Sequence, residues 1–211
     1  MKRIIFLFLF ITAFESKAQS VIPIDRYGKG LQSYYRSMDV EHHWLAGTHI
    51  NWETGVADKP DATSGIATHC SAFAAAACEN LGVYLLRPPE HPQVLLANAQ
   101  YNWLASPAAL AANWQPVSGD NSYEAAQTRA NNGFIVIAIC KNPISNKPGH
   151  VALVIPAEVS SVDLAAAGPL VIMAGTHNYT SIPLNRGFKS HITEWPEHAI
   201  TFYFNTKRFA F

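Results

Sequence analysis

A cysteine at the start of a predicted helix carries the clearest chemistry in this sequence. Thr68 can cap a helix with its hydroxyl, good helix formers run from Phe73 to Leu81, and Gly82 can end the helix in the left-handed conformation. Cys70 then lies in the first turn, where unpaired N–H groups and the positive end of the helix dipole favour a thiolate. Cys70 is therefore a candidate nucleophile, and the alternative is a small buried core side chain.

Two later positions can supply the groups that such a nucleophile needs. His150 begins a predicted strand over residues 150–155, and a neutral imidazole there can accept the thiol proton. Asn178 follows another predicted strand, and its amide can fix the histidine tautomer. His177 is the alternative for this third role, because neighbouring side chains of an extended segment face opposite ways. The order predicts a Cys–His–polar triad, provided that the helix packs across the sheet.

The elements that must position these side chains are helices first and strands after. The uninterrupted run of β-branched and apolar residues over 134–140 is typical of a strand buried on both faces, and residues 142–149 form a hairpin connection. This order predicts an α+β fold, with N-terminal helices packed on a mainly antiparallel sheet. Helices are expected over 31–40, 70–81, 93–104 and 122–131, and strands over 134–140, 150–155, 170–174 and 199–204.

The first eighteen residues have the pattern of a secretory signal. Lys2 and Arg3 precede an apolar run from Ile4 to Phe14, and small residues end at Ala18, where cleavage is expected. The run is too short for an ordinary membrane span, and no later segment is long enough, so no span is expected after cleavage. We therefore expect a periplasmic or secreted bacterial protein. Residues 19–211 fit one catalytic domain with its core at about 60–205.

Composition excludes some classes of protein and leaves the cysteines open. The 15 Lys and Arg residues balance 15 Asp and Glu residues, so the chain lacks the basic surface of a nucleic-acid-binding protein. A 49% hydrophobic composition excludes a disordered chain. Cys70 and Cys78 would lie about 12 Å apart on one helix, too far for a disulfide. Cys78 and Cys140 either pair with each other or are two buried thiols.

Histidines before the predicted helix suggest a metal site as an alternative. His49 and Asp58 partly match the signature of zinc peptidases, but their spacing is two residues too long and no His-x-His element follows. We therefore predict no metal ligands. A zinc-dependent cell-wall peptidase or a zinc-binding protein that uses His42, His43 and His49 is kept as a second hypothesis.

Two short motifs resemble a known family. The segments 68–73 (Thr-His-Cys-Ser-Ala-Phe) and 148–154 (Pro-Gly-His-Val-Ala-Leu-Val) resemble the NlpC-type and CHAP-type cysteine amidases and peptidases of the papain-like superfamily. The likeness covers about residues 60–180, and His69 stands where the family usually has another residue. It implies that the α+β fold is of the papain-like kind, and that Cys70 is the nucleophile and His150 the general base and then acid, with Asn178 or His177 as the third group.

The same resemblance implies a function. It predicts an exported cysteine hydrolase that cleaves an amide bond, in peptidoglycan stem peptides, through a thioester and without a cofactor. The Cys70 backbone would hold the oxyanion, and His69 and Trp52 would lie on the substrate side. A monomer is expected, and an inhibitor or immunity protein could be a partner. An acyltransferase with the same residues and an inactive cell-wall-binding protein of the same fold are the alternatives.

Overall fold

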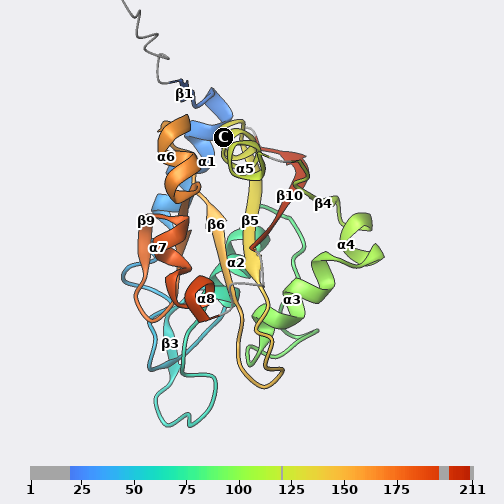
Figure 1. Cartoon of the computed structure of the whole chain (residues 1–211). Coiled ribbons are helices and arrows are strands. Elements are labelled where there is room, and N and C mark those ends of the chain that lie inside the picture. The colour runs from blue at the N-terminus through green and yellow to red at the C-terminus, as the bar shows by residue number, and fades with distance from the viewer. Residues whose placement is uncertain (1–19, 120, 195–199, 210–211) are drawn as a thin grey trace, which may run out of the picture.

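The computed structural model describes residues 20–119, 121–194 and 200–209 (Figure 1). The helices are α1 (Arg26–Ser37), α2 (Cys70–Asn80), α3 (Leu96–Leu104), α4 (Pro107–Ala111), α5 (Ser122–Asn131), α6 (Ser161–Ala167), α7 (Leu184–Gly187) and α8 (Lys189–Glu194). The strands are β1 (Val21–Ile22), β2 (His49–Ile50), β3 (Ala57–Lys59), β4 (Trp114–Pro116), β5 (Phe134–Cys140), β6 (His150–Val154), β7 (Val159–Ser160), β8 (Leu170–Met173), β9 (Tyr179–Pro183) and β10 (Thr201–Arg208).

An antiparallel six-stranded sheet forms the centre of the molecule. Its strand order is β4-β10-β5-β6-β8-β9, and short pairs β1-β7 and β2-β3 lie outside it. β5 and β6 are joined by the predicted hairpin, with Cys140 directly opposite His150. The prediction of an α+β fold with an antiparallel sheet is confirmed, although helices also follow the first strands of the sheet and are not confined to the N-terminal half.

The sheet separates two hydrophobic cores. Ile135, Ile137 and Ile139 of β5 belong to the core that contains α2, whereas the alternating residues Val136 and Ala138 belong to the core formed with α5 and α7. Every residue of β5 after Phe134 is buried, because both faces of the strand are covered. Figure 1 shows this arrangement, with α2 behind the sheet and α5, α7 and α8 in front.

Helix α2 packs closely on the sheet because it is built from alanine. All of its residues from Cys70 to Cys78 are buried, and the helix contacts β6 and β8. Gly82 has φ +63°, which confirms the predicted left-handed end. The predicted Thr68 cap is wrong: His69 occupies the N-cap position, and no side chain caps the helix there.

The first residues of two other helices differ from the predicted ones, and each difference has a local cause. α1 starts at Arg26 and not at residue 31, because the Asp25 carboxylate accepts a 2.8 Å hydrogen bond from the Gly28 N–H and caps the helix. α3 starts three residues after the predicted position, because Leu95 has φ +58°. α5 and β5 have the predicted boundaries.

The described residues test the expectation about membrane spans but do not include the predicted signal segment. None of the described helices has the length and apolar character needed to cross a membrane. The predicted signal segment 1–18 lies outside the described residues.

Candidate active site

Cys70 is the first residue of α2 and lies against β6. Its side chain is buried, with the residue 4% exposed. Burial raises the pKa of the Cys70 thiol above its ordinary value, although the backbone N–H groups of Val151, Ser71 and Cys70 itself act in the opposite direction. The sequence-based expectation of a resting thiolate is therefore wrong, because loss of hydration outweighs the helix terminus. The N–H groups around the sulfur are nevertheless donors for negative charge that develops there.

A small cavity opens at Cys70. It has a volume of about 230 Å³ and lies between the start of α2, the segment before α3 and the β5–β6 hairpin. Most of its surface is apolar, which suits a short aliphatic side chain. The lining residues are Gly65, Ala67, Thr68, His69, Cys70, Ser71, Gln93, Val94, Leu95, Leu96, Ala97, Asn146 and Pro148.

His150 starts β6 and is 5% exposed. Its Nε2 atom is buried without a hydrogen-bond partner among the described residues. The ring packs edge-on against Phe188, with centroids 4.6 Å apart, and stacks on His191 at 4.9 Å. Burial lowers the pKa of His150 to about 3, and the nearby His191 acts in the same direction. His150 is thus a neutral imidazole at neutral pH and can accept a proton.

The side chains of Cys70, on α2, and His150, on β6, lie on opposite faces of the sheet. His150 is paired with Cys140, so these two side chains share the face that packs on α7 and contains Phe188. Val151, the next residue, points to the other face, where its core includes Cys70. The structure therefore brings the two residues to the same end of β6 without a hydrogen bond between them, and the predicted direct contact is absent from this conformation.

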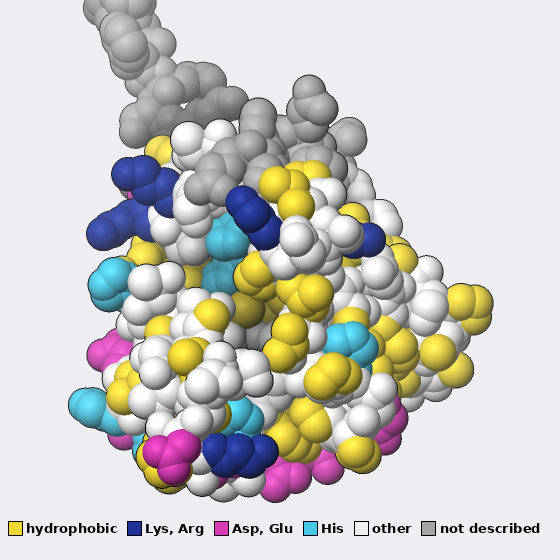
Figure 2. All heavy atoms as spheres, turned by 90° about the horizontal axis from the view of Figure 1, so that it is seen from below, with side chains coloured by type: hydrophobic (Ala, Val, Ile, Leu, Met, Phe, Trp, Pro, Cys, Tyr) yellow, Lys and Arg dark blue, Asp and Glu magenta, His cyan; other side chains and the backbone are white. Residues whose placement is uncertain are grey.

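A second cavity of about 480 Å³ lies in front of His150. Thr68 and Pro148 line both this cavity and the cavity at Cys70, so the two hollows adjoin at the end of the sheet. Figure 2 looks at this end of the molecule and shows a central hollow with hydrophobic side chains around much of its rim and histidines beside it. The lining residues of the second cavity are Thr68, Pro148, Gly149, His150, Met173, Gly175, Thr176, His177, Tyr179, Arg186, Gly187, Lys189, Ser190 and His191.

Asn178 does not orient His150. Its Nδ2 donates to the carbonyl oxygens of Val40 (2.7 Å), His43 (2.8 Å) and Trp44 (3.3 Å). Its Oδ1 accepts a 2.9 Å hydrogen bond from the Gly175 N–H. The amide therefore fastens the loop after α1 to the end of β8, and its predicted role as the third catalytic group finds no support in these contacts.

The other candidates for the third group differ in position. His177 is exposed and lines the cavity in front of His150. His191, on α8, is the imidazole that stacks on His150. Nothing in the sequence pattern points to His191, because the short helix α8 has no clear periodicity and 41 positions separate the two histidines.

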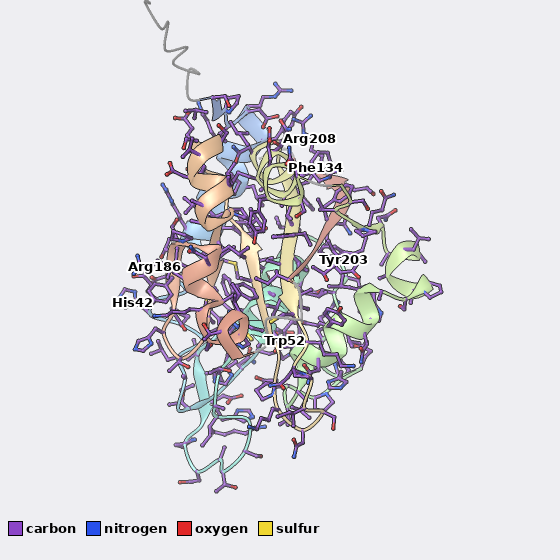
Figure 3. All side chains as sticks on the ribbon, viewed as in Figure 1. His42, Trp52, Phe134, Arg186, Tyr203 and Arg208 are labelled. Carbon is purple, nitrogen blue, oxygen red and sulfur yellow. The ribbon has the colours of Figure 1, made fainter. Side chains whose placement is uncertain are left out.

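Two residues expected on the substrate side lie beside the first cavity. The ring of His69 is buried, its Nε2 donates to the Thr48 carbonyl oxygen at 2.8 Å, and burial lowers its pKa. A neutral His69 adds no positive charge at Cys70. Trp52 lines a third hollow of about 320 Å³ that shares Gln93 and Val94 with the first, and Figure 3 labels it in the lower half of the ribbon.

The positions of the histidines and cysteines bear on the metal and disulfide alternatives within the described chain. His49 Nδ1 lies 2.5 Å from Asp58 Oδ1, yet no group of three or more His, Cys, Asp or Glu side chains in that part of the chain is placed to hold a metal ion. Cys70, Cys78 and Cys140 are all unpaired and buried. Cys78 and Cys140 lie in different cores, on opposite faces of the sheet, so the pairing left open by the sequence is not formed.

Comparison with known proteins gives no relative for this site. No family model matches the chain, and searches of curated proteins and of solved structures found no similar protein.

Proposed function

We propose that this protein is a cysteine hydrolase that cleaves an amide bond in a peptide, with Cys70 as the nucleophile. The observation that carries the proposal is the position of Cys70, which heads a buried helix, lines a cavity and has backbone N–H groups around its sulfur. The resemblance of residues 68–73 and 148–154 to the NlpC-type and CHAP-type enzymes suggests peptidoglycan stem peptides as the substrate class.

His150 is proposed as the proton acceptor. Its neutral, buried imidazole has an unpartnered Nε2 and borders the cavity next to that of Cys70. The two side chains start on opposite faces, so rotation of the His150 side chain around the end of β6, toward Thr68 and Pro148, is the movement that the reaction requires. Gly149 and Gly175 flank the ring without side chains of their own.

The proposed reaction has two steps. The Cys70 sulfur bonds to the carbonyl carbon while its proton passes to His150, and the C–N bond then breaks as the leaving amine takes that proton. Water next attacks the thioester, giving up a proton to His150, and the C–S bond breaks to release the acid and restore the thiol. The backbone N–H groups at Cys70 face the charge that develops during both steps.

The test is hydrolysis of purified peptidoglycan peptides by the wild-type protein and by Cys70→Ala and Cys78→Ala variants, followed by mass spectrometry. Cys78 is the matched control because it is buried in the same helix and lies in no hollow described above. We expect Cys70→Ala to lose cleavage and Cys78→Ala to retain it. A brief reaction quenched in acid should also show a peptide bound to Cys70.

Three results would contradict the proposal. They are equal cleavage by the wild-type protein and Cys70→Ala, loss of cleavage with a metal chelator, and binding to cell walls without cleavage by any variant. The second would point to a metal enzyme and the third to a binding protein.

A further inference from the structure

We propose that the cavity in front of His150 is a binding subsite for a carboxylate, and that it receives the part of the substrate beyond the scissile amide. The assignment of the cavity to the leaving-group side rests on the proposed function, whereas binding of a carboxylate does not. The cavity is a defined hollow of about 480 Å³, large enough for a residue or two of a peptide.

The charges around this cavity are of one sign. Arg186 and Lys189 are the charged side chains that line it, beside the imidazole rings of His150, which is neutral, His177 and His191, and no Asp or Glu is among the lining residues that the structure describes. Glu41, which accepts a hydrogen bond from the Thr180 N–H on the neighbouring strand β9, is not a lining residue. A hollow with cationic walls concentrates anions, so its chemistry favours a negatively charged ligand.

The cations at the rim are not used by the fold. Within the described residues neither Arg186 nor Lys189 has a salt bridge or side-chain hydrogen bond. Both are exposed, and Figure 3 places Arg186 at the outer margin beside α7. Arg186 can present a planar fork of donors to a carboxylate, and Lys189 a single mobile charge.

The interior of the cavity provides the second, independent sign of a ligand. The Nε2 of His150 is buried, faces no protein partner and belongs to a ring that lines this hollow. Buried polar atoms are normally satisfied, so this one indicates a polar group from a ligand. Ser190 and Thr176 add neutral donors to the lining.

The position of the cavity decides which part of the substrate it receives. It meets the apolar cavity of Cys70 at Thr68 and Pro148. A peptide whose scissile carbonyl lies at Cys70, with a small aliphatic side chain in the first cavity, would then extend past His150 into the second. The leaving amine would belong to a residue that carries a free carboxylate.

The experiment measures binding without catalysis. N-acetyl-dialanine and its C-terminal amide are titrated by NMR into the Cys70→Ala protein, and into that protein carrying in addition Arg186→Gln with Lys189→Gln. We expect the acid to bind at least tenfold more tightly than the amide, and the double substitution to remove most of this difference. Added salt should weaken binding of the acid only. N-acetylglutamate α-amide, whose only carboxylate is in the side chain, identifies which kind of carboxylate fits.

The same titration includes a matched control and has outcomes that would overturn the proposed subsite. Lys29→Gln removes an exposed cation from α1, outside the cavity, and should leave binding of the acid unchanged. Equal binding of acid and amide would overturn the subsite, as would a loss with Lys29→Gln equal to that of the double substitution. Selective binding of the acid, combined with no cleavage of peptidoglycan peptides by the wild-type protein, would sink the hydrolase proposal and leave the subsite standing.

Discussion

At the scale of single residues, Cys70 shows how two opposing effects decide the state of a thiol. A helix terminus and nearby N–H groups lower a thiol pKa, but here removal of the sulfur from water has the larger effect. The resting site therefore combines a neutral thiol with a neutral imidazole. Proton transfer must then accompany the attack and cannot precede it as a stable ion pair.

This protonation state leads to a prediction for alkylation. A raised pKa means that Cys70 of the folded protein stays a thiol through neutral pH, so its reaction with iodoacetamide should accelerate only at more alkaline pH than that of the same cysteine in urea. Mass spectrometry of quenched samples at several pH values gives both profiles. Faster alkylation of Cys70 in the folded protein than in urea at pH 7 would contradict a raised thiol pKa. The His150→Ala variant would then show whether the histidine causes the faster reaction.

Asn178 carries the second prediction at this scale. Its amide bonds the carbonyl oxygens of Val40, His43 and Trp44 together with the Gly175 N–H. Asn178→Ala leaves these groups without their partner, so we expect the free energy of unfolding to fall by about 2 kcal/mol. Urea denaturation measures this loss. Asn185→Ala is the control, because that exposed side chain has only a 3.5 Å hydrogen bond to Ala166, and its stability should change by less than about 0.5 kcal/mol.

At the scale of elements, close contact between α1 and α5 depends on a glycine. A Cβ added to Gly28 would lie 2.0 Å from the Asn131 carbonyl oxygen. Alanine in a helix normally gains up to about 1 kcal/mol over glycine, but separating two packed helices costs about 1–3 kcal/mol. We therefore expect Gly28→Ala to lower the free energy of unfolding and the melting temperature.

The control for this substitution lies in the same helix. Lys29 is exposed, so Lys29→Ala changes helix propensity without a steric clash and should leave the melting temperature nearly unchanged. If Gly28→Ala were as stable as Lys29→Ala, the contact between the two helices would be looser than the structure shows.

Elements whose sequence matched a simple pattern could be predicted well. The apolar run 134–140 became β5, Ser122–Asn131 became α5, and the hairpin placed His150 at the start of β6. The face of β6 that His150 occupies could not be predicted, because a strand buried on both sides has no polar alternation to mark its faces. The sequence pattern did not predict β9, α7 or α8, because short, mixed segments have neither helical nor strand periodicity. His191 was not identified for the same reason, since it lies on α8.

The candidate site shows the same division. Cys70 and its helix followed from local composition, and Cys70 lines a cavity at one end of the sheet. Asn178 was assigned from its distance past a strand, which gives no information about the loop that its amide holds. The cationic cavity could not be foreseen, because Arg186 and Lys189 line one cavity with His150 only as a result of the packing of α7 on β8 and β9 and of α8 on α7.

At the scale of the whole molecule, buried histidines set the stability in acid. The pKa of His150 is lowered to about 3, and that of His69 is lowered too, both chiefly by burial. Unfolding restores the ordinary value near 6.5, so between about pH 6.5 and pH 3 the unfolded chain binds more protons than the folded protein. Stability must then rise with pH across this window and fall as the solution is acidified.

The measurement is urea denaturation at several pH values between 7 and 3.5. Below pH 6, the titration of His150 in the unfolded chain should lower the free energy of unfolding by about 1.4 kcal/mol for each unit by which the pH falls. His150→Gln cannot titrate, so its slope should be shallower, whatever its stability at pH 7. His42→Gln is the matched control, because His42 is exposed, beside Asp39, and its pKa is raised. Removal of His42 should not flatten the slope, and an identical slope for His150→Gln and wild type would show that the folded protein accommodates a charged His150.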